Sequence, residues 1–255
     1  MIKTDSPLLL HIPHSSTVIP KEELPSFCAD DLPGELLRMT DHYCDEIFTG
    51  YDRVVFPVSR LVCDPERFRD DASEPMSKVG MGAVYTSTSS GSPLRSVTPS
   101  LRESILSRYY DPHHRLFTEA VSKKLDSFGR CLIVDGHSFS PVPLPYESDR
   151  RSARPDICIG TDAFHTPGLL ADAAAEHFRS AGFSVAMNFP YCGSIVPMRY
   201  YGIDRRVSSV MIEINRGLYM CRGGERNAGF PVIKRTVSEL LELLDRMMRE
   251  TGEAV

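Results

Sequence analysis

The stretch 131–139, Cys-Leu-Ile-Val-Asp-Gly-His-Ser-Phe, constrains the fold of this chain more than any other segment. Its first half is a short apolar run, which is typical of a strand buried on both faces in the sheet of an α/β protein. The character then changes at Asp135, and Gly136 allows the backbone to turn sharply. His137 is therefore expected at the carboxyl end of a central strand, where open α/β sheets bind their ligands, and Asp135 is a candidate to orient it.

A second strand followed by a histidine occurs near the start of the chain. Residues 7–12 form an apolar run that ends at Pro13-His14-Ser15-Ser16. If both strands lie in one sheet, His14 and His137 can meet at one edge of it. His11, inside the first apolar run, is interpreted as a core histidine with satisfied hydrogen bonds rather than a ligand. His113 is interpreted as exposed.

Helical and extended patterns alternate along the rest of the chain. The spacing of apolar residues predicts helices over 30–48, 100–128, 169–181 and 232–248, with a break near Asp111 because Pro112 follows it. Further strands are expected at 54–56, 61–63, 157–159, 185–187 and 207–214. This alternation predicts an α/β fold over residues 1–255 in a single domain, with a mixed, mainly parallel sheet covered by helices on both faces.

The composition excludes several classes of protein. A formal net charge of -5 favours neither nucleic acid nor an anionic membrane as a partner. The seven cysteines are scattered as single residues without a Cys-x-x-Cys pair, so reduced thiols in a cytoplasm are expected rather than a disulfide scaffold. The apolar run at Leu8-Leu9-Leu10 is too short for a signal peptide or a membrane span. We therefore expect a cytoplasmic protein, and the sequence leaves its oligomeric state open.

A carboxylate from the helix predicted at 30–48 completes a candidate metal site with His14 and His137. Asp41 and Asp45 lie four residues apart and would share one face of that helix, so either can serve. Two imidazoles and one carboxylate leave an open coordination position, which is the usual arrangement of catalytic zinc. Such a zinc lowers the pKa of its bound water to about 7 and polarises a carbonyl. One zinc ion per chain is the expected cofactor.

Charged residues near the ends of other strands extend this hypothesis. Glu213 ends the strand expected at 207–214, either as general base for the zinc-bound water or as a structural partner of Arg216 or Arg205. A guanidinium group can grip a carboxylate of an acidic amino-acid derivative, although a single arginine is usually only solvated. The arginines on loops after strands are Arg60, Arg67, Arg69 and Arg199.

These pieces together resemble the N-formylglutamate amidohydrolases, also called N-formylglutamate deformylases. The resemblance runs in the family's order from residue 7 to about residue 240. Each motif is short, and the ordered set is specific. The motifs are Pro13-His-Ser15 with Ile19-Pro20, Thr40-Asp41 with Asp45, Arg60-Leu-Val-Cys-Asp-Pro-Glu-Arg67, Gly82-Ala-Val-Tyr85-Thr, Tyr109-Tyr110 with Pro112 and His114, Asp135-Gly-His-Ser138, Asn188-Phe-Pro-Tyr191 with Gly193, and Ile212-Glu-Ile-Asn-Arg with Leu218-Tyr-Met220.

The resemblance implies a fold like that of the zinc-dependent carboxypeptidases and aspartoacylases, and hydrolysis of an N-acyl amino acid. The substrate that it implies is N-formyl-L-glutamate, which would give formate and L-glutamate. It also implies that His14, Asp41 and His137 bind the zinc and that Glu213 is the general base. Arg60 or His114 is the donor expected at the oxyanion, and the expected substrate contacts are Arg67, Arg199, Tyr85 and Asn188.

Glu66 departs from the family pattern, which often has Asn before the arginine at position 67. The change removes an amide donor and adds a negative charge beside the expected carboxylate site. Two alternatives therefore stay open: hydrolysis of a different N-acyl amino acid or amide on the same scaffold, and a ligand-binding descendant without turnover.

Overall fold

A six-stranded sheet forms the centre of the computed structural model, which describes residues 2–147, 151 and 153–250. The strand order is β2-β1-β3-β6-β4-β5. Neighbouring strands pair in parallel, except that β4 and β6 are antiparallel. The strands are β1 (Leu8–Ile12), β2 (Arg53–Val55), β3 (Cys131–Phe139), β4 (Ile157–Gly160), β5 (Val185–Met187) and β6 (Val207–Asn215). The predicted mixed, mainly parallel α/β sheet is confirmed.

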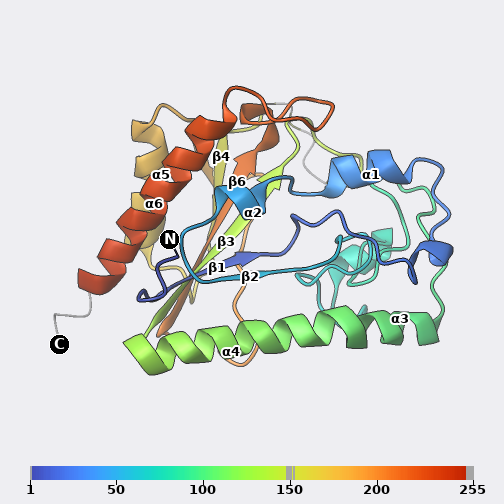
Figure 1. Ribbon diagram of the computed structural model, residues 1–255, viewed down its shortest axis with the longest axis horizontal. Coiled ribbons are helices and arrows are strands. Elements are labelled where there is room, and N and C mark those ends of the chain that lie inside the picture. Colours follow the sequence, from blue (N-terminus) through green and yellow to red (C-terminus); the bar gives the residue numbers. More distant parts are fainter. Residues whose placement is uncertain (1, 148–150, 152, 251–255) are drawn as a thin grey trace.

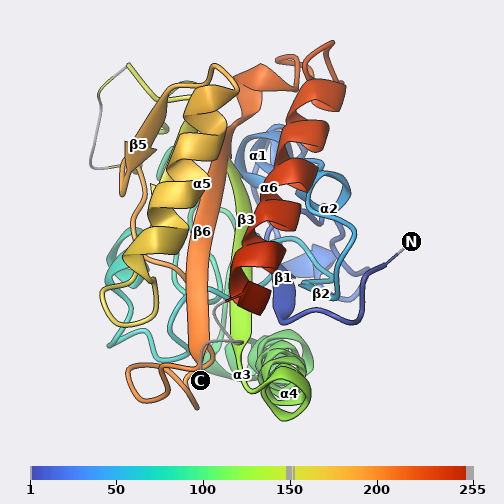
Figure 2. The same cartoon turned by 90° about the vertical axis from the view of Figure 1, so that its left-hand side faces the viewer.

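Helices cover both faces of this sheet (Figures 1 and 2). The long helix α4 (Asp111–Phe128), preceded by α3 (Pro99–Ile105), packs on one face, and α5 (Gly168–Ser180), α6 (Phe230–Glu250) and the short α2 (Cys44–Ile47) pack on the other. Helix α1 (Leu32–Met39) lies beyond the carboxyl ends of β1 and β3. None of the helices that the structure describes is both long and apolar enough to span a membrane.

The alternation of side chains along β3 places Asp135 and His137 on the α4 face. Val134 packs into the apolar cluster beneath α5 and α6, whereas Ile133 packs with Phe117 of α4. Successive side chains of a strand point to opposite faces, so Asp135 and His137 lie on the same side as Ile133. The helix that covers this side therefore lies next to any site that these residues form.

The helix predicted over 30–48 is wrong as a single element. Helix α1 ends at Met39, Thr40 is extended with φ -82° and ψ 139°, and Tyr43 has a positive φ of 67° before α2 begins. A tertiary contact replaces the helical one, because the backbone N–H of Asp41 donates to the carbonyl of His14 at 2.9 Å. Asp41 consequently lies in the connection between two helices and shares no helical face with Asp45.

Two smaller predictions are also corrected. Residues 61 and 62 lie in a turn and residue 63 is irregular, so no strand forms there. Gly136 makes no turn because β3 continues to Phe139. A Cβ atom at position 136 would stand 2.7 Å from the ring of Phe48, so glycine is needed there for close packing. The break predicted near Asp111 is confirmed: a π-helical segment, Leu106–Tyr110, separates α3 from α4, and Pro112 lies in the first turn of α4.

Candidate metal and active site

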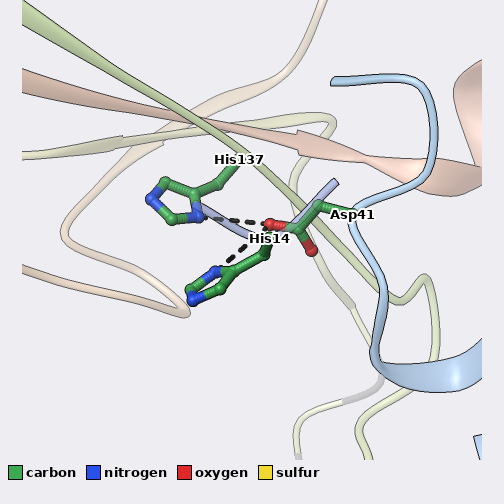
Figure 3. Close-up of side chains that lie close together, drawn as sticks. All are labelled: His14, Asp41 and His137. Atoms are coloured by element: carbon green, nitrogen blue, oxygen red, sulfur yellow. Dashed lines mark hydrogen bonds and ion pairs between the residues drawn. The ribbon is translucent and has the colours of Figure 1, made fainter. Parts of the chain in front are cut away.

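Three side chains with metal-ligating atoms meet where β1, β3 and the α1–α2 connection come together (Figure 3). Nδ1 of His137 lies 3.2 Å from Oδ2 of Asp41, and Nδ1 of His14 lies 3.7 Å from the same oxygen. With bonds of about 2.0–2.1 Å, two ligand atoms of a tetrahedral zinc ion stand about 3.4 Å apart. The three groups are therefore spaced to bind one metal ion. Asp45 takes no part in this cluster.

Burying this cluster without a metal ion costs free energy. His14, Asp41 and His137 are each at most 3% exposed. Nδ1 of His14 is buried and has no hydrogen-bond partner among the described residues. A buried polar atom without a partner costs free energy, and a metal ion at this point would satisfy it. The donor set thus fits a metal ion.

The charges in the cluster respond to one another. Burial alone would raise the pKa of Asp41, but the neighbouring imidazoles of His137 and His14 hold that pKa well below its usual range. Burial alone would lower the pKa of His137, but Glu66 and Asp135 raise it well above its usual value. Without metal His137 therefore tends to hold a proton, which an incoming metal ion must displace.

Asp64 orients the imidazole of His14. Its Oδ1 lies 2.9 Å from Nε2 of His14, and its Oδ2 accepts two hydrogen bonds from Arg60 at 2.7 and 3.2 Å and one from the hydroxyl of Tyr85 at 2.7 Å. Metal-binding histidines commonly donate their second ring N–H to a carboxylate in this way. Arg60 and Tyr85 thus fix Asp64, and Asp64 leaves Nδ1 of His14 free to face Asp41.

Glu213 stands beside this cluster as a buried carboxylate. It is the direct neighbour of His137 in the pairing of β3 with β6, and it is 7% exposed. Its Oε2 atom has no hydrogen-bond partner among the described residues. Burial raises the pKa of Glu213 to about 8, although His137 opposes this. Proton affinity near neutral pH is what a general base or acid requires.

The alternative interpretation of Glu213, as a structural partner of arginine, is not supported. The guanidinium of Arg205 lies over the ring of Phe164, 4.2 Å from its centroid. Arg216 instead donates from Nη1 to three backbone carbonyls at the end of α1, those of Leu37, Arg38 and Thr40. Within the part of the chain that the structure describes, Glu213 forms no ion pair with an arginine.

A cavity of about 670 Å³ opens over the cluster. Its size is typical of a small-molecule site. Arg67 lines the cavity and is only loosely paired, since its Nε lies 3.9 Å from Asp64 and has no hydrogen-bond partner among the described residues. The cavity thus offers a guanidinium group to a ligand. The predicted site residues that line it are His14, Asp41, Arg60, Arg67, His114, His137 and Glu213.

Three predicted substrate contacts lie away from the lining of this cavity. Tyr85 is fully buried and binds Asp64. Asn188 pairs with Thr161, accepting from its backbone N–H at 2.9 Å and donating to its hydroxyl at 2.8 Å. Arg199 lines a smaller, adjoining cavity of about 390 Å³. The structure therefore does not bring these three side chains together with the metal cluster.

His113 is buried rather than exposed, which corrects the expectation from the sequence. It is 4% exposed, and its Nε2 lies 3.0 Å from Nε2 of His11. Phe117, four residues later on α4, belongs to the apolar core, and residues four apart share a helix face. That spacing is the signal that could have identified His113 as buried. His11 is fully buried with both ring nitrogens in hydrogen-bond contact, as expected for a satisfied core histidine.

Comparisons with known proteins agree with the geometry. The family model of the N-formylglutamate amidohydrolases matches residues 6–220. The crystal structure of N-formylglutamate amidohydrolase from Ralstonia eutropha JMP134 is similar, with a TM-score of 0.85, 25% identity, and coverage of 98% of this chain and 96% of that one. A gene product from Agrobacterium tumefaciens shares the fold, with a TM-score of 0.65, 21% identity, and coverage of 94% and 92%. A comparison with curated proteins gives no match. The chain belongs to the N-formylglutamate amidohydrolase family.

Proposed function

We propose that this protein is a zinc-dependent hydrolase of N-acyl amino acids and that N-formyl-L-glutamate, cleaved to formate and L-glutamate, is the first substrate to test. The observation that carries the proposal is the convergence of His14, Asp41 and His137 with the unpaired, buried carboxylate of Glu213 in one cavity. Membership of an amidohydrolase family supports the same reaction class.

Glu213 is the proposed general base. Zinc held by the three ligands would polarise the substrate carbonyl and lower the pKa of a bound water to about 7. From its position beside His137, Glu213 can accept a proton from the attacking water and then deliver it to the leaving nitrogen. Its raised pKa suits both roles, because the same carboxyl must bind and release a proton.

Arg60 is the better placed of the two predicted oxyanion donors. Its Nε and Nη2 bind Asp64, and no hydrogen bond to Asp64 uses its Nη1. His114 also lines the cavity, but its Nε2 lies 2.8 Å from the carbonyl of Pro65 and is therefore occupied. Donors aimed at developing negative charge are a large source of rate enhancement. We assign this role to Arg60.

A screen of N-acyl amino acids tests the proposal. The metal-stripped protein would be compared with the same protein after zinc is restored, and released acid would be measured. We expect zinc-dependent hydrolysis. A zinc-loaded protein that binds N-acyl amino acids in calorimetry but hydrolyses none of them would instead identify a ligand-binding descendant.

Arg67 should bind the substrate carboxylate. A hydrogen bond to a charged group contributes about 1.5–3 kcal/mol, so Arg67→Ala is expected to lower kcat/KM by roughly ten- to a hundredfold. Arg67→Lys should not fully rescue, because lysine lacks the planar fork. Steady-state kinetics would check this, with Arg206→Ala as a control because Arg206 is exposed and pairs with Asp204. Unchanged kcat/KM in Arg67→Ala would place the carboxylate elsewhere.

Glu66 should weaken binding of a second substrate carboxylate. It lines the cavity, and its Oε2 lies 3.3 Å from Nε2 of His137 and 3.8 Å from Nδ1 of His14. We therefore expect kcat/KM for N-formyl-L-glutamine, which has the same shape without the second charge, to be at least comparable to that for N-formyl-L-glutamate. Glu66→Asn should raise the value for the glutamate substrate. Strong preference of the parent for N-formyl-L-glutamate, together with no effect of Glu66→Asn, would contradict this prediction.

A further inference from the structure

A line of four side chains in polar contact leads from helix α4 to the metal cluster. Nε2 of His113 lies 3.0 Å from Nε2 of His11, and Nδ1 of His11 lies 2.9 Å from Oδ1 of Asp135. The same oxygen lies 3.1 Å from Nε2 of His137, within ion-pair distance but outside hydrogen-bond alignment. Each of the four residues is at most 4% exposed. Their protons are therefore shared among these four side chains and the carboxylates of Asp41 and Glu66 that contact His137.

The contacts determine which ring nitrogen of each histidine carries a proton. A carboxylate at neutral pH has no proton to donate, so Nδ1 of His11 must be the donor to Asp135. Nε2 of His11 then offers only a lone pair, and the contact with His113 is a hydrogen bond only when Nε2 of His113 carries the proton. His11 therefore carries its proton on Nδ1, and His113 carries a proton on Nε2.

The same reasoning applies to His137. Its Nε2 faces two carboxylates, with Oδ1 of Asp135 at 3.1 Å and Oε2 of Glu66 at 3.3 Å, and therefore carries a proton. Its Nδ1 lies 3.2 Å from Asp41 and by the same rule also carries a proton while no metal ion is bound. A metal ion would displace the Nδ1 proton and leave Nε2 protonated between Asp135 and Glu66. The opposite tautomer of His11 would instead place a lone pair against Asp135 at 2.9 Å, which is repulsive.

Helix α4 holds the ring of His11 from a second direction. The ring stacks on Phe117, with centroids 4.4 Å apart and an interplanar angle of 12°. Phe117 lies one turn after His113, so one helix supplies both the hydrogen-bond donor and the stacking surface. Neither His11 nor His113 lines the cavity, so neither is placed to touch a substrate.

We propose that His11, backed by His113, is a positioning residue that fixes Asp135 and thereby presents Nδ1 of His137 to the metal ion. The inference rests on the metal site of the proposed function. It goes beyond that function because it assigns a role in metal binding to two histidines that contact neither metal nor substrate.

Zinc affinity, measured by competition with a chromophoric chelator, tests the role of His11. His11→Phe removes the donor and keeps a ring for Phe117, and we expect zinc to bind about tenfold more weakly, at the low end of the effects of outer-shell partners. His11→Asn keeps an N–H near the position of Nδ1 and should recover most of the affinity. His177→Phe is the matched control, because His177 bonds a carbonyl of α6 away from the cavity. It should bind zinc as the parent does.

Nitrogen NMR of histidine-labelled protein gives a readout that needs neither zinc nor substrate. In the parent we expect the Nδ1–H tautomer for His11 and the Nε2–H tautomer for His113. In His113→Phe, His11 should keep this tautomer, because the contact of its Nδ1 with Asp135 remains. If thermal unfolding shows that His11→Phe does not fold, zinc affinity would be measured on His113→Phe instead. That variant is expected to weaken zinc binding by less than about tenfold.

Two results would overturn the inference. The first is an Nε2–H tautomer of His11 in the parent protein. The second is zinc affinity equal to that of the parent in a folded His11→Phe variant, or in His113→Phe if His11→Phe does not fold. A parent that binds no zinc would overturn the proposed function instead, and the tautomer of His11 would still decide whether this line of contacts exists.

Discussion

Replacing Glu213 by glutamine should lower kcat for N-acyl amino acid hydrolysis by about a hundredfold to ten-thousandfold, the usual loss when a general base is removed. Glutamine keeps the size of the side chain and removes its basicity. The carboxylate of Glu213 is not part of the cluster formed by His14, Asp41 and His137. The variant should therefore keep its zinc while turnover collapses.

Steady-state kinetics and elemental analysis of the same preparation would separate the roles of Glu213. Glu242→Gln is a suitable control, because Glu242 is 51% exposed on α6 and pairs only loosely with Lys3 at 3.7 Å. Loss of zinc from Glu213→Gln would identify Glu213 as a ligand. Turnover close to that of the parent would leave it a structural residue.

The sequence predicted the parts of this site that depend on local pattern. The apolar runs before His14 and before Asp135 gave two of the strands, and β1 and β3 do lie side by side in parallel. Parallel neighbours bring their carboxyl ends to the same edge of a sheet, so the meeting of His14 with His137 followed from the pattern alone.

The choice between Asp41 and Asp45 could not be made in the same way. Helical periodicity placed both residues on the same face of one helix, but it contains no information on where that helix ends. The helix ends because Thr40 becomes extended and Asp41 bonds the backbone of His14, a contact between segments far apart in the sequence. Only the folded chain shows this contact.

Apart from Asp135, the residues that orient the candidate ligands were also beyond local pattern. Asp64 follows β2 and contacts His14 after β1, while His113 on α4 reaches Asp135 on β3 through His11. Such partners are chosen by packing between elements, and each looks ordinary in its own segment. Sequence reasoning therefore finds candidate ligands at strand ends more readily than the groups that hold them in place.

Removing any of the three proposed ligands should abolish tight zinc binding. The parent is expected to contain roughly one zinc ion per chain after mild purification, the stoichiometry of a single catalytic site. His14→Ala and His137→Ala each leave two protein ligands, so their zinc content should fall close to zero. Elemental analysis after gel filtration would measure this.

Asp41 and Asp45 form a matched pair for the same measurement. Asp41 is 3% exposed and lies 3.2 and 3.7 Å from the two histidines, whereas Asp45 is more exposed and lies on α2 outside the cluster. Asp41→Ala should lose the metal ion and Asp45→Ala should keep it. The reverse result would show that α2 rearranges to bring Asp45 to the ion.

Zinc retained in both His14→Ala and His137→Ala would show that the site lies elsewhere. The other group of suitable ligand atoms among the described residues is formed by His11, Glu66 and Asp135, which also lie within 4.8 Å of one another. In that case Glu66→Gln should release the ion. Glu66 is not a ligand in the site formed by His14, Asp41 and His137, so that site predicts that Glu66→Gln keeps its zinc. This variant therefore separates the two arrangements.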